Sequence, residues 1–341
     1  MYRHSKINEN LFVNWLTFTL ILIYIMIIVG GLTRLTNSGL SITEWELFKG
    51  ILPPLSQSSW IAYFDSYKTI PQFKLLYPNM SLEEFKIIFY WEYFHRILGR
   101  LIGLVFLFPF LYFFLLKKID KKFFYPCLLI LSLIIIQGII GWYMVKSGLV
   151  NDVTVSHYRL SLHLIMALII ISIIFWLLIN LKRGTSKSFF NFSKHNFPVL
   201  TLTVLVFLQI VFGAFVSGLD AGQIYQTWPL MNSSYFPADF SLINYKDLFD
   251  FDNHSLVQFY HRNLAYLISI YIIFLSYYIY KKDFKFLYKP LILVLIFLFA
   301  QITLGIFTLI SGLNIMLASA HQIFSVLLVF STINLYYFYI K

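Results

Sequence analysis

The chain has 341 residues, of which 59% are hydrophobic and only 12% are charged. Soluble domains carry about 25% charged residues, so this composition excludes a protein built from two or three soluble domains and predicts one embedded in a lipid bilayer. The single cysteine, Cys127, excludes an intramolecular disulfide and a cysteine-ligated zinc or iron–sulfur site. The net charge is +11, but the basic residues form no basic tail or basic-aromatic patch. They flank the apolar spans instead, so we expect no nucleic-acid partner.

Eight windows of about 20 mostly apolar residues predict eight transmembrane helices. In chain order they cover residues 13–32, 90–116, 124–145, 158–181, 198–217, 256–280, 290–310 and 315–340. The first span follows Arg3 and Lys6, as a signal peptide would, but it is long for one and lacks a small-x-small cleavage site. We therefore expect it to be retained, in an all-α integral membrane protein.

The basic residues are unevenly divided between the two sides of the membrane. One side, which includes both termini, carries 15 of the 26 Lys and Arg residues and three acids, whereas the other carries 11 basic residues and 12 acids. The positive-inside rule then places both termini in the cytoplasm. The two long loops, residues 36–89 and 219–255, are expected outside, which for a bacterial inner membrane means the periplasm.

The chain contains one internal repeat. Residues 93–96 (YFHR) match 259–262 (FYHR), and residues 137–149 (QGIIGWYMVKSGL) match 301–313 (QITLGIFTLISGL), at offsets of 166 and 164. Each repeat holds four spans, an even number, so both insert in the same orientation. We expect two pseudo-symmetric four-helix bundles, formed by residues 1–181 and 182–341.

Four of the eight histidines lie inside spans, and they are His95, His163, His261 and His321. Each lies near the outer end of its helix, roughly 6 to 9 Å below the membrane boundary at 1.5 Å rise per residue. One pair lies in each half, His95 with His163 and His261 with His321. His157 is an alternative to His163 as the residue equivalent to His321 in the repeat. Depth favours His163, because His157 lies at the interface.

Four imidazoles at one depth predict metal ligation. A single intramembrane histidine could simply hydrogen-bond to a neighbouring helix. Two pairs on the facing helices of two bundles instead suit the axial ligation of two haems. Zinc or copper fits less well, because no cysteine or close cluster of carboxylates or methionines completes the coordination.

The two halves differ at one position near these histidines. Glu92 precedes His95 by three residues, on the same helical face, whereas the second half has Gln258 before His261. Only the first half therefore has an ionisable group over its haem, which suggests chemistry in one half and electron transfer in the other. Arg96 and Arg262 directly follow two of the histidines and could pair with haem propionates. Weaker candidates for the same role are Arg34, Arg100 and Arg159.

Over nearly its whole length the chain resembles the haem A synthase family, in its type 2 branch of alphaproteobacterial and mitochondrial members. The resemblance is carried by residues 30–45 (GGLTRLTNSGLSITEW), 92–100 (EYFHRILGR), 141–149 (GWYMVKSGL), 157–164 (HYRLSLHL), 213–222 (GAFVSGLDAG) and 227–231 (TWPLM), with His261-Arg262 and Ala320-His321-Gln322. The cysteine pairs of the Gram-positive branch are missing, which fits type 2. The first loop, with Trp45, could cover a substrate pocket.

The resemblance implies oxidation of the C8 methyl group of haem O to the formyl group of haem A, for cytochrome c oxidase. It implies that His261 and His321 hold a haem b cofactor, that His95 and His163 bind the haem O substrate, and that Glu92 is catalytic. Implied partners are haem O synthase, a farnesyltransferase, and an electron donor or acceptor, and the chain could also form a homo-oligomer.

Two other functions remain open from the residues alone. A di-haem cytochrome that passes electrons between a quinone and a partner accounts for the histidines but gives Glu92 no role. A proton-coupled transporter accounts for the repeat, but it does not explain why the histidines lie near one surface of the membrane.

Overall fold

The structure is a computed structural model that describes residues 9–44, 49–150, 153–190, 193, 195–239 and 245–340. Arg3, Lys6 and Trp45, named above, lie outside these residues. The described part is helical, and its only strand-like feature is an isolated bridge between Met231 and Ser234.

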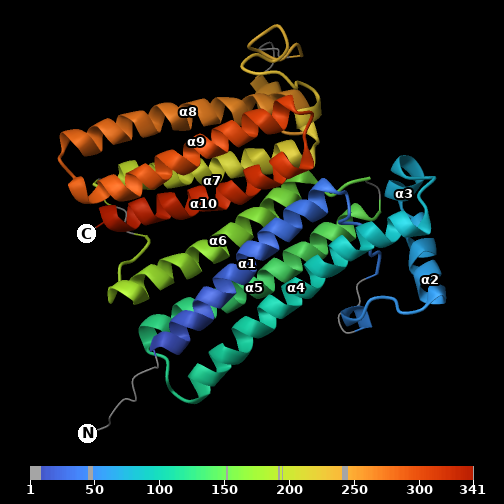
Figure 1. The fold of residues 1–341 in the computed structure, drawn as a ribbon, viewed down its shortest axis with the longest axis horizontal. Coiled ribbons are helices and arrows are strands. Elements are labelled where there is room, and N and C mark those ends of the chain that lie inside the picture. The colour runs from blue at the N-terminus through green and yellow to red at the C-terminus, as the bar shows by residue number, and fades with distance from the viewer. Residues whose placement is uncertain are drawn as a thin grey trace. The chain divides into compact units, whose positions relative to one another are not determined.

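Among the described residues, eight helices are long and apolar enough to cross a membrane. They are α1 (Glu9–Leu35), α4 (Leu82–Leu115), α5 (Lys121–Gly148), α6 (His157–Arg183), α7 (Phe197–Gly218), α8 (His254–Lys281), α9 (Tyr288–Ile310) and α10 (Ile315–Tyr339), shown in Figure 1. The shorter helices are η1 (Lys49–Ile51), α2 (Gln57–Lys68), α3 (Pro71–Leu76), η2 (Ala221–Gln223), η3 (Tyr245–Phe249) and η4 (Lys285–Leu287). The predicted all-α, eight-span class is confirmed, and the chain is a multi-pass integral membrane protein.

Helix α4 begins eight residues before the span predicted from hydrophobicity. Ser81 caps the helix, since its Oγ accepts from the Glu84 backbone N–H at 3.3 Å while Glu84 Oε2 accepts from the Ser81 N–H at 2.8 Å. This reciprocal capping box satisfies two otherwise unpaired donors at the helix start. The first turns of α4 are polar, so a window that searches for apolar residues misses them.

The first outer connection contains α2 and α3, which the sequence analysis did not predict. Their apolar side chains pack against the start of α4 in one buried cluster. Its fully or nearly fully buried members are Leu40, Ile42, Trp60, Phe64, Tyr67, Ile70, Phe85 and Phe89. Burial raises the pKa of Tyr67, so its hydroxyl stays protonated and donates to Gln72 Oε1 at 2.9 Å. Packing therefore anchors this loop to α4.

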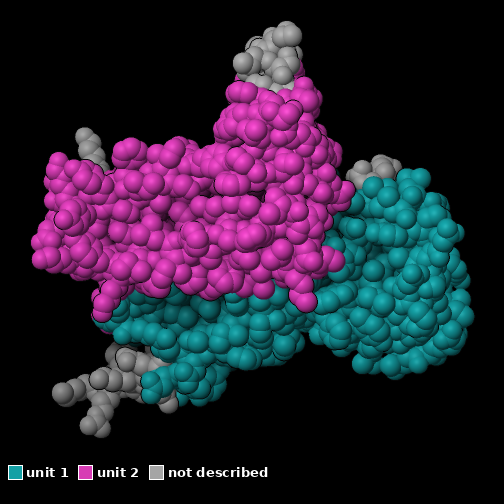
Figure 2. Space-filling model, turned by 45° about the horizontal axis from the view of Figure 1, so that its top comes forward, with its two compact units in different colours: residues 1–159, 166–183 teal, residues 160–165, 184–341 magenta. Residues whose placement is uncertain are grey.

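The chain divides into two compact units, shown in Figure 2. Unit 1 comprises Met1–Arg159 and Met166–Arg183, and unit 2 comprises Leu160–Ile165 and Gly184–Lys341. Within unit 1, α4 packs against α1 and α5. Within unit 2, α7 packs against α8, and α10 packs against both α7 and α9. The pseudo-symmetric relation of two bundles stays a prediction.

Candidate functional site

His261 and His321 lie close together inside unit 2, on α8 and α10. Their ring centroids are 6.4 Å apart and their planes are inclined at 83°. Two imidazoles on opposite sides of one metal ion, each with its nitrogen about 2 Å from the metal, have centroids roughly 6 Å apart. The separation therefore fits a pair of axial ligands to one iron.

Glycines make room for both rings. A Cβ added at Gly213 of α7 would lie 3.1 Å from His261 Cε1, and one at Gly305 of α9 would lie 2.9 Å from His321 Cε1. A larger residue at position 305 would displace the His321 ring, because 2.9 Å is shorter than real Cβ contacts, and one at position 213 would press against the His261 ring. The two rings are thus held against helix backbones, which limits their rotation.

Hydrogen bonds to Gln301 orient the His321 ring. His321 Nδ1 is 3.0 Å from the Gln301 carbonyl oxygen, to which it can donate, and His321 Nε2 is 3.3 Å from the Gln301 amide nitrogen. A donating Nδ1 leaves the lone pair on Nε2, where a metal would take the place of the Gln301 amide as its partner. The residues present therefore fit an iron porphyrin with His261 and His321 as its axial ligands.

Unit 1 shows the same ring-on-glycine contact at His95. A Cβ at Gly30 of α1 would lie 3.1 Å from His95 Nε2. His163 lies on α6, within the short stretch Leu160–Ile165 that groups with unit 2. The pairing of His95 with His163 therefore stays a prediction, as does the preference for His163 over His157.

Glu92 is buried in unit 1 with four donors around its carboxylate. Its side chain is 3% exposed. Oε2 accepts from Ser41 Oγ and from the Ile42 N–H, both at 2.8 Å. Oε1 accepts from Arg96 Nε at 3.0 Å and Nη2 at 2.6 Å. Since every contact is a donation to a carboxylate oxygen, these donors fix the position of the side chain.

The contacts around Glu92 have a counterpart in unit 2. Arg96 Nη2 donates to the Ile42 carbonyl at 2.9 Å, and Arg262 Nη2 donates to the Tyr225 carbonyl at 2.8 Å. Gln258 also donates to the Tyr225 carbonyl, at 3.0 Å. Glu92 and Gln258 therefore lie in matching surroundings. Of the two side chains, only Glu92 is ionisable.

Four of the predicted arginines contact neutral groups, whereas Arg96 also pairs with Glu92. The contacts are Arg34 Nη1 to Asn37 Oδ1 at 2.8 Å, Arg100 Nη1 to the Gly50 carbonyl at 3.3 Å, and the Arg159 guanidinium over the Tyr143 ring at 5.0 Å. Arg262 Nη1 donates to the Leu230 carbonyl at 3.2 Å. Arg262 Nε is buried and has no hydrogen-bond partner among the described residues, so it could still donate to a bound anion.

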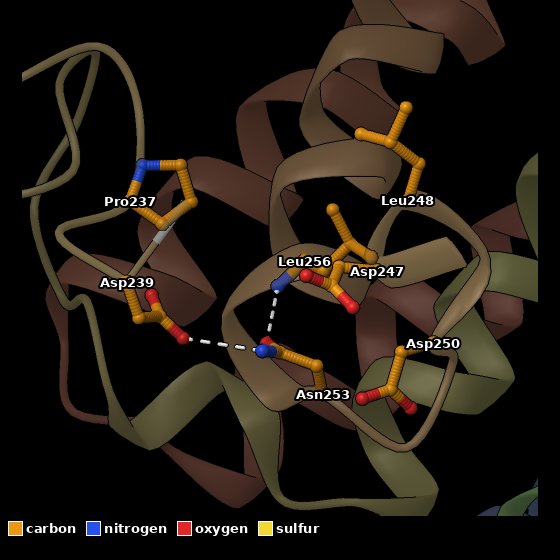
Figure 3. Close-up of a pocket in the computed structure, with 7 residues that line it drawn as sticks. All are labelled: Pro237, Asp239, Asp247, Leu248, Asp250, Asn253 and Leu256. Carbon is orange, nitrogen blue, oxygen red and sulfur yellow. Dashed lines mark hydrogen bonds between the residues drawn. The ribbon is translucent and has the colours of Figure 1, made fainter. Parts of the chain in front are cut away.

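A hollow lies at the start of α8, in the connection that precedes the helix. Pro237, Asp239, Asp247, Asp250 and Asn253 are among its lining residues (Figure 3). Asn253 donates to Asp239 Oδ2 at 3.2 Å and accepts from the Leu256 N–H at 2.9 Å, as the cap of α8. Within the described ranges, no three His, Cys, Asp or Glu residues are placed to hold a metal ion.

The sequence analysis missed the residues that support the histidines. Gln209 and Gln301 contact the rings, and Gly30, Gly213 and Gly305 receive them. A signal was present, because each of these glycines follows a Gln or Met by four residues. A residue four positions earlier lies on the same helical face, so the pattern could have been read as one contact surface.

These features define a class: a multi-pass helical membrane protein with two facing histidines in its interior.

Residues 13–333 match the family described as cytochrome oxidase assembly protein (COX15-CtaA). The chain is 48% identical over 320 residues to the haem A synthase of Pelagibacter ubique, with 93% of each chain covered. It is 41% identical over 315 residues to that of Wolbachia pipientis, covering 92% of this chain and 88% of the relative. The corresponding enzyme of Flavobacterium psychrophilum is 38% identical over 330 residues, covering 95% and 97%. The chain belongs to the haem A synthase family of cytochrome oxidase assembly proteins.

Proposed function

We propose that the chain is a haem A synthase, an oxidoreductase that acts on a C–H group and converts the C8 methyl group of haem O to the formyl group of haem A. The observation that carries this proposal is the match to haem A synthases along nearly the whole chain. The relay cytochrome is less well supported, because it leaves the buried charge of Glu92 without a role.

His261 and His321 are proposed to hold a haem b cofactor, which would supply electron transfer. The 6.4 Å separation of the rings and the two glycines that receive them support this assignment. The haem O substrate is proposed to bind through His95 and His163 in the N-terminal half, residues 1–181, whereas residues 182–341 form the cofactor half. The contact between His95 and Gly30 supports the first of these ligands.

Glu92 is proposed to act beside the substrate as a fixed negative charge. It lies one turn from His95 on α4, and its four donors hold the carboxylate in place. A charge held in this way can stabilise positive charge that develops at the reacting methyl group. Arg96 and Arg262, and more weakly Arg34, Arg100 and Arg159, are proposed to pair with propionates.

The reaction itself requires a partner outside the chain. Replacing two hydrogens of the methyl group by one oxygen is a four-electron oxidation when water supplies the oxygen, so an electron acceptor must take part. Haem O synthase is a proposed partner as the source of the substrate, and a homo-oligomer is a further proposal. We place the chain in a bacterial inner membrane, with both termini in the cytoplasm and the haems near the periplasmic face.

The division between the halves can be tested with purified protein supplied with haem O. His95→Ala and His163→Ala should lose haem O and keep haem b, measured by extraction and mass. Loss of haem b from these variants, with haem O retained, would reverse the assignment of the two halves.

A further inference from the structure

Residues 50–55 (GILPPL) form an apolar stretch in the first outer connection, from the end of η1 to the residue before the cap of α2. Its large apolar side chains are exposed, Ile51 by 49%, Leu52 by 67% and Leu55 by 80%. Exposed apolar side chains are expected on the spans, but this stretch lies outside the eight spans. Contiguous apolar surface of this kind marks a contact with a partner or with a membrane.

Two contacts with α4 fix the depth of this stretch. Arg100 Nη1 donates to the Gly50 carbonyl at 3.3 Å, and the Tyr93 hydroxyl donates to the Ile51 carbonyl at 2.6 Å. Figure 1 shows this part of the chain, in blue, beside α4.

Arg100 lies inside the hydrocarbon core by two counts along α4. It is ten residues past the start of the apolar span at residue 90. About 20 helical residues cross the core, so a count back from Leu115, the end of α4, begins the core at about residue 96. Gly50, which is bonded to Arg100, therefore lies below the membrane boundary as well.

The backbone of the stretch meets the requirement that lipid imposes. In hydrocarbon, backbone N–H and C=O groups must find partners within the protein. Side chains of α4 supply donors to the carbonyls of Gly50 and Ile51. Pro53 and Pro54 have no N–H group to satisfy. The stretch therefore has fewer polar groups to desolvate than an ordinary loop of its length.

The described part of the second outer connection differs in depth and in charge. Tyr260 of α8 donates to the Leu248 carbonyl at 2.8 Å, only four residues past the start of that span at residue 256. Asp247 and Asp250 flank Leu248, and charged groups are costly to place in lipid. An uncharged stretch at membrane depth is therefore particular to the first connection.

We propose that residues 50–55 insert among the lipid chains of the leaflet nearer to the first outer connection, with Ile51, Leu52 and Leu55 in contact with hydrocarbon. The depth of Gly50, the paired carbonyls and the absence of charge together select lipid as the partner. Insertion ties to the bilayer the same connection whose Ser41 and Ile42 hold Glu92. The proposal involves no haem, so it stands or falls separately from the proposed function.

The test uses the full-length protein in phosphatidylcholine vesicles, with a nitroxide spin label on Leu52→Cys or Leu55→Cys. The native Cys127 is buried and is replaced by Ala in all samples. Oxygen concentrates in lipid and a nickel chelate stays in water, so the ratio of their collision rates with the label reports its surroundings.

Two labelled controls come from the same unit. Phe108→Cys, 62% exposed within α4, gives the ratio for lipid, and Asn79→Cys, exposed just before α4, gives the ratio for water. We expect the ratios at Leu52 and Leu55 to be close to that at Phe108 and several-fold above that at Asn79. Ratios equal to that at Asn79 would place the stretch in water and overturn the proposal. Protection from both reagents would show that protein covers the stretch, which would overturn it too.

The Tyr93 hydroxyl offers a second measurement that leaves the apolar side chains in place. Tyr93→Phe removes the donor to the Ile51 carbonyl and leaves that oxygen unpaired in lipid. The ratio at a Leu52→Cys label should then fall several-fold toward the value for water. Tyr90→Phe is the matched control, because the Tyr90 ring lies one turn away on the same helix, and it should leave the ratio unchanged.

Discussion

The imidazoles of His261 and His321 lie 6.4 Å apart between their centroids and come from two different helices, α8 and α10. Neither ring is free to rotate away, because Gly213 and Gly305 receive them on the backbones of α7 and α9. Four helices thus hold one pair of rings, whose histidines are 60 positions apart in the chain. The separation matches that of two axial ligands on one iron.

Removing either of these rings should remove the cofactor. We expect His261→Ala and His321→Ala to lose most of the b-type haem, because a single axial ligand cannot keep the iron six-coordinate and low-spin. Absorbance spectra of the purified protein measure the effect. His254→Ala, at the exposed start of the same helix α8, is the control and should retain its haem. A double His261 and His321 variant that is fully loaded with haem would contradict the assignment.

Adding one methyl group at Gly305 should disturb the same site. In Gly305→Ala the new Cβ would lie 2.9 Å from His321 Cε1, and overpacking of this kind costs about 1–3 kcal/mol. We expect a several-fold lower haem b content. Gly138→Ala in α5 is the matched control, since nothing lies within 4 Å of its Cβ and alanine is the better helix former. Equal haem content in the two variants would show that the glycine contact does not matter for binding.

The charge of Glu92 should matter for catalysis more than for haem retention. Glu92→Gln keeps the shape of the side chain and reproduces the residue found at Gln258. We expect this variant to assemble, to keep the C-terminal haem b, and to make at least tenfold less haem A, with haem O or its hydroxylated form accumulating. Haem extraction and mass analysis give the result. A wild-type yield of haem A would leave Glu92 with a structural role only.

Ser41 offers a milder change to the same group. Ser41→Ala removes the 2.8 Å hydrogen bond to Glu92 Oε2 but leaves the Ile42 N–H and Arg96 in place. A hydrogen bond to a charged group contributes about 1.5–3 kcal/mol, so haem A formation should fall by less than in Glu92→Gln. If haem A formation fell further in Ser41→Ala than in Glu92→Gln, anchoring of the first outer loop by Ser41 would matter more for the reaction than the charge of Glu92.

The predicted orientation places both termini in the cytoplasm. A reporter fused after Lys341 should therefore be active only if it is of a cytoplasmic type, and one inserted in the outer connection before Ser81 only if it is periplasmic. The positive-inside rule is the physical basis. Periplasmic activity of the C-terminal fusion would reverse the orientation and the side on which the haems lie.

Much of the fold could be predicted because membrane spans depend on composition, which is directly readable. All eight spans were found, whereas α2 and α3 were missed, since these short helices carry polar residues and depend on packing such as that of Trp60 against Phe89 at 5.0 Å. The repeat and the shared depth predicted His261 and His321 as a pair, and their rings lie 6.4 Å apart. They did not identify Gln209, because a polar residue inside an apolar span gives no sign of what it contacts.

The identity of the haems made by the chain tests the account most directly. The chain should be expressed in a host that makes haem O but has no haem A synthase, and the extracted haems should be identified by mass. The account predicts haem A, together with a tightly bound haem b. Recovery of haem O and haem b alone, from protein that is folded and carries a low-spin haem, would contradict it and favour the relay cytochrome.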